Sequence, residues 1–444
     1  MANVDISYII KQAKENNVKF IRLWFSDILG FLKSFAIVAD ELEEALEDGI
    51  PFDGSSIEGF ARIDESDMLA VPDPETFQIL PWRSNEKSAV ARMICDIRRP
   101  DGTPYESDPR QVLKKALTHA HDLGYIFYVG PELEFFYFAN DDAPPKTLDK
   151  GGYFDLTPLD IASDLRRDTV MMLEQVGIDV EYSHHEGAPS QHEIDLRYTD
   201  ALSMADSIMT TRLIVKEVAA QHGYFASFMP KPLTEFNGSG MHTNMSLFRN
   251  ESNVFYDENN PDKLSLTGQQ FVAGILRHAP ELTLIANQWV NSYKRLTPGF
   301  EAPTHIAWAY LNRSHLLRVP ALKRGRQESM RVEIRSPDVA CNPYLLFAVL
   351  LNAGLEGIEN EYEPIPPTEA MMEKLSDSDR KRLGVGQLPV DLDQAITAAT
   401  DSDLLRRTLG DHMYHKLLEN KKIEWRKFMS RVTDYEWERY LPML

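Results

Sequence analysis

The stretch "VGPELEFFYF" at residues 129–138 has the pattern of a buried β-strand, yet it carries two like charges. Alternate side chains of a strand point to the same face, so Glu132 and Glu134 share one face. Bulky apolar residues such as Leu133 and Phe135 occupy both faces, which is typical of a core strand. The two carboxylates therefore indicate either a functional site inside the protein or a half-exposed sheet.

Three further segments have apolar residues on one face of a predicted strand and polar or ionisable residues on the other. Their polar and ionisable residues are Glu186 and Glu193 in "SHHEGAPSQHEIDL" (183–196), His242, Asn244 and Ser246 in "GSGMHTNMSLF" (238–248), and Arg331, Glu333 and Arg335 in "MRVEIRSPD" (330–338). His184, His185 and His192 are individually more typical of hydrogen-bonded structural groups than of ligands. His242 is the better candidate, because the glycines before it let a backbone or a ligand come close.

Charge accounting indicates what such a cluster needs. Two carboxylates about 4 Å apart repel by ~1 kcal/mol in water and by ~4 kcal/mol at a typical effective protein dielectric. Several of them buried together would protonate unless cations compensate. Glutamate oxygens with one or two imidazoles suit Mg²⁺ or Mn²⁺. These residues alone predict a divalent-metal enzyme acting on anionic substrates, with a metallohydrolase as an open alternative.

A nucleotide would have to be bound without a phosphate-binding loop, because the chain contains no G-x-x-x-x-G-K-[ST] motif. Metal ions and arginines would then hold it, since the planar guanidinium group pairs with carboxylate and phosphate. Arginines are also common on solvated surfaces, so a purely surface role stays open for each of them. The candidates lie in the later half of the chain: Arg295, Arg313, Arg318, Arg331 and Arg335.

Composition limits the class of protein. The 444 residues are 43% hydrophobic and carry a formal charge of −21, which makes nucleic acid an unfavourable partner. Only Cys95 and Cys341 are present, so we expect neither a disulfide framework nor a thiolate zinc site. The N-terminal residues have no apolar core of a signal peptide, and no run of 18 apolar residues could span a membrane. We expect a cytoplasmic globular protein.

The length favours two domains. The polar, proline-bearing stretch "RRPDGTPYESDP" (98–109) is the best boundary. A helix should follow it, with Asp108 as the N-cap and Gly124 at its end. The mixture of strands and helices predicts an α+β fold, with strands at 129–138, 190–197, 241–248 and 331–335 and helices at 158–176 and 202–222.

Several motifs resemble type I glutamine synthetase, nearly end to end and in matching order and spacing. They are "FDGSSIEGF" (52–60), "GPELEFF" (130–136), "SHHEGAPSQHEID" (183–195), "KPLTEFNGSGMH" (231–242), "NSYKRLTPGFEAP" (291–303), "NRS" (312–314) and "RVEIRSPDVACNPY" (331–344). Length and tail are most similar to the shorter, feedback-inhibited branch. The resemblance implies a β-grasp-like N-terminal domain at 1–104 and a catalytic domain at 105–444, in which helices flank a curved antiparallel sheet.

The resemblance also implies a divided metal site. Glu134, Glu186 and Glu193 would hold one divalent ion, and Glu132, His242 and Glu333 would hold a second ion that bridges the nucleotide phosphates. The two carboxylates of the opening strand would thus serve different ions. The implied cofactor is Mg²⁺ (or Mn²⁺), with two or three ions per active site, and ATP is the co-substrate.

The implied reaction is ATP-dependent ligation of ammonia to L-glutamate through γ-glutamyl phosphate. The residues that match the glutamate and phosphoryl contacts are Asn237, Gly238, Arg295, Arg313 and Arg335. Those that match the ATP contacts are Tyr198, His242, Ser246, Arg318 and Arg331. Glu301 would close the site and take a proton from ammonium. Asp53, from the N-terminal domain of a neighbouring subunit, would bind the ammonium.

The family pattern further implies a homo-oligomer, a dodecamer of two stacked hexamers with active sites between subunits. Arg62 matches a position linked to glutamine feedback, and nitrogen-regulatory proteins or 2-oxoglutarate are candidate regulatory partners. A γ-glutamyl ligase for another amine or polyamine is the alternative function, but carboxylates at Asp53 and Glu301 favour a small cation. An inactive relative would have lost metal ligands, whereas all six positions carry them.

Overall fold

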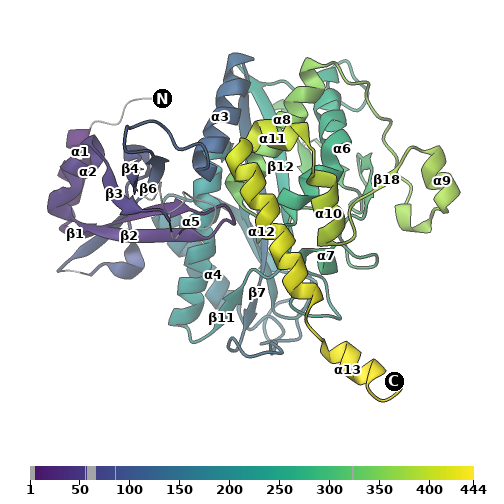
Figure 1. The fold of residues 1–444 in the computed structure, drawn as a ribbon, viewed down its shortest axis with the longest axis horizontal. Helices are drawn as coiled ribbons and strands as arrows, with labels where there is room; N and C mark the ends of the chain where they lie inside the picture. The colour runs from purple at the N-terminus through teal and green to yellow at the C-terminus, as the bar shows by residue number, and fades with distance from the viewer. Residues whose placement is uncertain (1–5, 56, 58–66, 86, 323–324) are drawn as a thin grey trace.

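Two β-sheets organise the protein. The computed structural model describes residues 6–55, 57, 67–85, 87–322 and 325–444, with a smaller N-terminal part and a larger part that holds the remaining helices (Figure 1). The buried apolar side chains form two main clusters, one from Ile9 to Tyr105 and the other chiefly within residues 112–418. Each sheet therefore has its own core.

The N-terminal sheet has six strands in the order β2-β1-β6-β4-β3, with β5 beside β6. β1 and β6 run parallel, and the other pairs are antiparallel. Two helices accompany the sheet, α1 (Ile6–Glu15) and α2 (Leu42–Glu47). The strands are β1 (Val18–Ser26), β2 (Leu32–Val38), β3 (Ile50–Asp53), β4 (Asp67–Pro72), β5 (Gln78–Ile79) and β6 (Ala89–Arg98).

The helix predicted after the polar stretch at 98–109 is confirmed as α3 (Pro109–Asp122). The Asp108 side chain accepts a hydrogen bond from the backbone N–H of Arg110, as an N-cap does. Gly124 follows the helix with a φ of 81°, a left-handed conformation that glycine adopts without strain.

The larger sheet has ten strands, with the order β15-β16-β17-β12-β7-β9-β8 along its main path. Its strand pairs are antiparallel except β15 with β16. The strands are β7 (Ile126–Phe138), β8 (Val180–His185), β9 (Gln191–Leu196), β10 (Thr199–Asp200), β11 (Phe225–Ser227), β12 (Met241–Arg249), β13 (Ser252–Asn253), β15 (Trp308–Ala309), β16 (Leu317–Arg318) and β17 (Val332–Ile334). The four strands predicted from the sequence are all present.

Helices pack against this sheet and share its core. Close approach of α6 and α8 depends on Gly274, where a Cβ atom would lie 2.1 Å from the carbonyl oxygen of Ala353. The helices of this part are α4 (Ser163–Gln175), α5 (Ala201–Gln221), α6 (Leu266–Ala286), α7 (Ser292–Arg295), α8 (Pro343–Glu359), α9 (Asp377–Arg382), α10 (Leu392–Ala399), α11 (Asp403–Leu409), α12 (Asp411–Met429) and α13 (Asp434–Tyr440). A small separate sheet joins β14 (His305–Ile306) to β18 (Gly386–Gln387).

One predicted helix is shorter than expected. The segment 158–176 becomes helical only from Ser163, because the residues before it belong to a long loop. In that loop the Asp160 side chain accepts a hydrogen bond from the Ala162 backbone and pairs with Arg166 at 2.8 Å, which fixes the turn that enters α4.

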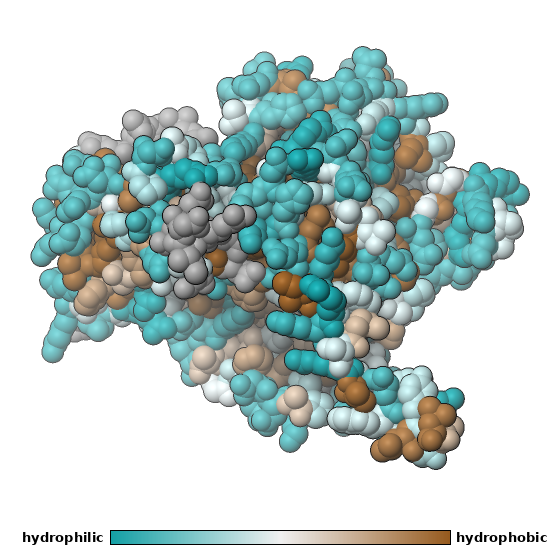
Figure 2. Space-filling view, in the orientation of Figure 1, coloured by the Kyte–Doolittle hydropathy of each residue, from teal (hydrophilic) through white to brown (hydrophobic). Residues whose placement is uncertain are grey.

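The C-terminal helix α13 projects from the body of the protein (Figure 1), and Figure 2 shows hydrophobic side chains gathered on this end of the chain. Trp437, Leu441 and Leu444 are all more than half exposed. Exposed apolar groups of this size are typical of an interaction surface. Among the described residues, no helix combines the length and apolar character that crossing a bilayer requires.

Candidate active site

Strand register gathers the predicted ligands in rows across the larger sheet. In one row, His242 on β12 lies opposite Glu132 on β7. In the next, Glu134 on β7 lies opposite Glu193 on β9. Glu333 on β17 pairs with Asn244 of β12, two residues beyond His242. Segments far apart in sequence therefore place their ionisable side chains on one face, as strand alternation predicted.

Glu132, His242 and Glu333 form one group whose ligand atoms all lie within 4.8 Å of one another. The His242 Nδ1 atom is 3.1 Å from a Glu132 oxygen. Asn244 donates a hydrogen bond to the other oxygen of Glu132 at 3.0 Å and accepts one from Arg331 at 2.9 Å. The arrangement leaves carboxylate and imidazole lone pairs facing one volume, as a metal site requires.

Glu134, Glu186 and Glu193 lie beside this group. Glu193 belongs to two overlapping clusters, one with Glu134 and His242 and the other with Glu186 and His184. The His184 Nε2 atom is 3.4 Å from a Glu193 oxygen. Glu134 is held from behind, because it accepts hydrogen bonds from the Gly240 backbone and the Gln191 side chain.

The electrostatics of the cluster call for cations. Burial, followed by the charge of Glu134, raises the pKa of Glu186 to about 8. Burial and the Asp195 charge raise the pKa of Glu193 well above its usual range, and burial with the Glu132 charge raises that of Asp195 to about 7. Burial lowers the pKa of His242 to about 3, with the nearby Arg335 charge acting in the same direction. A neutral imidazole among carboxylates whose pKa values are raised by burial and by one another is a good metal-ligand set.

Arginines close one side of the site. Arg318 pairs with Glu333 at 2.9 Å, and Arg335 pairs with the other oxygen of the same carboxylate. Arg295 is 2% exposed and donates hydrogen bonds to the backbone carbonyl groups of Arg335 and Ser336. Arg295 therefore fixes the segment that carries Arg335, and Arg335 and Arg318 remain directed at the metal-ligand cluster.

Two glycines, Gly238 and Gly240, let the loop that carries Asn237 approach Arg295. A Cβ atom at Gly238 would lie 2.1 Å from the carbonyl oxygen of Pro230, and one at Gly240 would lie 2.4 Å from the Arg295 guanidinium group. The short glycine run thus brings the loop that carries Asn237 against Arg295. Side chains at either position would push this loop away from the cavity.

A cavity of about 700 Å³ contains most of the predicted site residues. Its volume is in the range of small-molecule and cofactor sites. The predicted residues that line it are Glu132, Glu134, Glu186, Glu193, Asn237, Gly238, His242, Arg295, Glu301, Arg313, Arg318, Arg331, Glu333 and Arg335.

Three predicted residues among those described lie outside the cavity. Tyr198 is 53% exposed and packs edge-on against Tyr128, and Ser246 is buried on β12 opposite the same tyrosine. Neither of them lines the cavity. Asp53 is exposed on β3 of the N-terminal sheet, outside the cavity of its own chain. Arg62 falls outside the described residues.

The structure adds residues that sequence reasoning did not select. Tyr153, Tyr182, His184 and Gln191 line the cavity. Asp195, two residues after Glu193, lies opposite Glu132 in the sheet. The alternation that singled out Glu193 could have indicated Asp195 as well. Gln191 and Tyr153 carry no such signal, because a neutral side chain in a loop or at a strand end is common.

The fold and the site together are those of an enzyme class in which clustered carboxylates, a histidine and arginines suit divalent metal ions and anionic substrates. Comparison with known proteins makes this specific. Residues 106–440 match the family model of the glutamine synthetase catalytic domain, and residues 17–100 match that of the glutamine synthetase β-grasp domain. The chain belongs to the glutamine synthetase family, whose activity is ATP-dependent glutamine synthesis.

Relatives match over nearly their whole length. The glutamine synthetase of Mycolicibacterium smegmatis is 51% identical over 98% of this chain and 99% of its own, and that of Methanosarcina mazei is 50% identical over 98% and 97%. Among solved structures, a GmaS/ADP complex is 30% identical with a TM-score of 0.89, over 98% of this chain and 99% of that one. The glutamine synthetase of Plasmodium falciparum is 26% identical with a TM-score of 0.89, over 99% of both chains.

Proposed function

We propose that the cavity performs glutamine synthesis in two steps. ATP phosphorylates the glutamate side-chain carboxylate to give γ-glutamyl phosphate and ADP, and ammonia then displaces phosphate to give glutamine. The observation that carries this proposal is the arrangement of the buried carboxylates and His242 around one volume, with Arg318 and Arg335 at its edge. Such a site can neutralise the charge of a transferring phosphoryl group.

Two sets of side chains would each hold one metal ion. Glu132, His242 and Glu333 would hold one Mg²⁺ or Mn²⁺ ion. Glu134, Glu186 and Glu193, which line the same cavity, would hold another, although Glu134 and Glu186 belong to separate clusters that share Glu193. The bound ions would supply Lewis-acid stabilisation of phosphoryl oxygens. Asn244 orients Glu132, while Gln191 orients Glu134. These hydrogen bonds fix ligands that would otherwise turn away from one another because of their like charges.

The arginines and the glycine loop would bind the anions. Arg335 and Arg318 would bind the phosphoryl group; their ion pairs with Glu333 support this role. Arg331 would contact ATP, and Arg313 would contact glutamate or its phosphate, because both line the cavity wall. Asn237 and Gly238 would contact the glutamate. For Tyr198 and Ser246, only the family pattern supports a role in ATP binding.

Glu301 is proposed to take a proton from ammonium. It lines the cavity and raises the pKa of Glu186, which places the two carboxylates within electrostatic reach. Its backbone φ is 39°, in the left-handed region that costs free energy for a residue with a side chain. Such a loop can move to exclude water from the acyl phosphate.

Several broader features are proposed from the family pattern. We assign residues 1–104 and 105–444 as the two domains, and a dodecamer of stacked hexamers as the assembly. The exposed apolar side chains of α13 support association with other chains. Asp53 would complete the cavity of a neighbouring subunit. A cytoplasmic location, feedback through Arg62 and nitrogen-regulatory partners complete the proposal.

Phosphate release tests the proposed function and its alternative. With ATP, Mg²⁺ and glutamate, we expect ammonium to stimulate phosphate release far more than putrescine or ethanolamine at the same concentration. The reason is that Glu301 on the cavity wall and Asp53 of a neighbouring subunit would offer two carboxylates, which suit a small cation. Omission of glutamate is the control. Faster turnover with an organic amine would instead identify a γ-glutamyl ligase for that amine.

The metal-free protein should lose stability as the pH rises. Folding raises the pKa of Glu186 from 4.5 to about 8 and that of Asp195 from 3.8 to about 7, so the folded state binds protons more tightly than the unfolded state. This contribution is fully present below the unfolded pKa values and is lost as the pH rises through 7 and 8.

Thermal unfolding measures this effect. In EDTA, we expect the Tm to fall between about pH 6 and about pH 8.5, and saturating Mg²⁺ to raise the Tm more at the higher pH. Glu186→Gln should flatten the EDTA profile, because glutamine does not titrate. A stabilisation by Mg²⁺ that is equal at both pH values would contradict metal binding by these carboxylates.

A further inference from the structure

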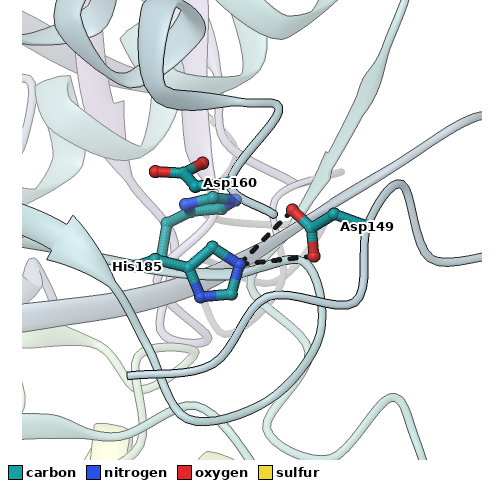
Figure 3. Close-up of side chains that lie close together, drawn as sticks. Asp149, Asp160 and His185 are labelled. Atoms are coloured by element: carbon teal, nitrogen blue, oxygen red, sulfur yellow. Dashed lines mark hydrogen bonds and ion pairs between the residues drawn. The ribbon is translucent and has the colours of Figure 1, made fainter. Parts of the chain in front are cut away.

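A buried cluster lies outside the cavity, where the loop at 139–162 meets the end of β8. Figure 3 shows the carboxylate of Asp149 facing the ring of His185. The His185 Nε2 atom is 3.3 Å from both carboxylate oxygens, and both side chains are at most 1% exposed. The contact joins a loop to the strand end that leads directly into Glu186.

The hydrogen bonds of His185 define what lies between these two groups. Its Nδ1 atom is 2.7 Å from the carbonyl oxygen of Glu186, and a carbonyl only accepts, so Nδ1 carries a proton. Nε2 faces a carboxylate, so either a second proton or a metal ion must separate two sets of lone pairs. Asp149, Asp160, His185 and His192 do lie close enough together to raise the second possibility.

The contacts of Arg166 indicate that a proton, and not a metal ion, lies between His185 Nε2 and Asp149. Its guanidinium group only donates, so the His192 Nδ1 atom, 2.7 Å away, is an acceptor and His192 keeps its proton on Nε2. The same guanidinium group pairs with Asp160 at 2.8 Å. Only Asp149 and His185 remain, which is too few ligands for an ion. Asp149 and His185 therefore form a buried ion pair.

The ion pair sits at the base of the turn that carries two predicted metal ligands. Besides His185, Asp149 accepts a hydrogen bond at 2.7 Å from the backbone of Ser190, which lies within the turn between Glu186 and Glu193. The Ser190 hydroxyl in return accepts a hydrogen bond from the Leu148 backbone at 2.6 Å. One carboxylate thus holds both the start and the middle of the turn.

We propose that Asp149 and His185 are positioning residues that hold Glu186 and Glu193 at metal-binding separation. The proposal rests on the proposed metal role of these two glutamates. Glu186 and Glu193 repel each other once both are ionised to bind an ion, and the hydrogen bonds that Asp149 accepts from His185 and Ser190 keep this turn from opening. Asp149 acts through the turn and touches neither substrate nor metal.

Metal binding to the full-length protein tests the proposal. We expect Asp149→Asn to weaken the binding of one Mn²⁺ ion by about 10- to 100-fold in calorimetric titration without substrates, while the other ion binds within about threefold of wild type. Raising the Mn²⁺ concentration should restore kcat, because the catalytic groups are intact. A merely structural loss would lower the Tm without separating the two ions.

Two matched variants separate a positioning role from a general loss of charge or of fold. Asp155→Asn removes a carboxylate from the same loop that accepts a hydrogen bond from Gly152, and it should leave both ions unchanged. Gly151→Ala is a second probe that preserves charge. Its Cβ atom would lie 2.6 Å from His185 Nε2, so it should weaken the same ion as Asp149→Asn even if that variant fails to fold.

The outcomes separate this proposal from the proposed function. If Glu186→Gln weakens one ion but Asp149→Asn and Gly151→Ala do not, the positioning role is wrong and the metal assignment stands. If Glu186→Gln leaves Mn²⁺ binding unchanged, the metal assignment itself is wrong. A further tightly bound ion that Asp149→Asn removes would show that the cluster in Figure 3 is a metal site, and would overturn the ion pair.

Discussion

Glu132→Ala abolishes ATP- and glutamate-dependent phosphate release while the protein stays folded: this is the expected result of removing one proposed ligand of a divalent metal ion. Glu132 shares its site with His242 and Glu333, and the pair that remains cannot hold a divalent ion firmly. Loss of several kcal/mol of charge stabilisation corresponds to about a 1000-fold loss of rate. The measurement is a coupled phosphate-release assay at saturating Mg²⁺.

The thermal stability of the metal-free Glu132→Ala protein should not fall with its activity. The Glu132 carboxylate is one cause of the raised pKa of Asp195, so its removal relieves repulsion in the metal-free protein. Its lost partners are the hydrogen bonds to His242 and Asn244, each worth about 1 kcal/mol or less net in a partly exposed site. We expect a Tm in EDTA equal to or above that of wild type.

A control two strands away in the same sheet makes the result specific. Glu181 lies exposed on β8, outside the cavity, and Glu181→Ala should keep phosphate release within about twofold of wild type. Phosphate release near the wild-type rate in Glu132→Ala would refute the ligand assignment. Loss of the folded state would show instead that Glu132 is a structural residue.

Sequence reasoning predicts the fold where local signals agree with burial. Alternation identified the strands that carry the metal-ligand candidates, and capping chemistry located α3 through Asp108 and Gly124. It misplaced the start of α4, because a contact between Asp160 and Arg166 outweighs the helical pattern of the preceding residues. Side-chain contacts of this kind have no periodic signature.

Some residues of the candidate site could likewise be predicted from the sequence, and others could not. Glu132 and Glu134 stand out because a charge on a buried strand is costly, and the register of the sheet then brings Glu193 opposite Glu134. The groups that hold these ligands could not be predicted. Gln191 and Asp149 act through hydrogen bonds that form only when segments distant in sequence fold together.

Asp53 raises the question of how its carboxylate could reach an active site. Within its own chain it lies on β3 of the N-terminal sheet, exposed and outside the cavity. Hydrogen bonds from Ser55 lower its pKa, so the group is ionised and able to bind a cation. An exposed anionic side chain at a sheet edge is available to a neighbouring subunit. The proposed shared site therefore requires that Asp53 and Glu301 of one cavity come from different chains.

Mixed oligomers test this arrangement directly. Asp53→Ala should raise the KM for ammonium strongly with little effect on ATP binding, and Glu301→Gln should lower kcat by about 100- to 10,000-fold because it removes a general base. In a random equal mixture of the two variant chains, assayed at ammonium well below the KM of Asp53→Ala, one half of the sites receive an intact Asp53 and one half an intact Glu301. About one quarter of the sites are then complete, so co-assembly should restore about a quarter of wild-type activity.

The restored activity distinguishes a shared site from a site within one chain. If both residues served the same chain's cavity, every cavity in the mixture would lack one carboxylate, and mixing would restore nothing. Each variant co-assembled with itself is the control, and it corrects for any gain from reassembly alone. Recovery near one quarter, measured as ammonium-dependent phosphate release, would show that catalysis needs two adjacent subunits; its absence would overturn the shared site.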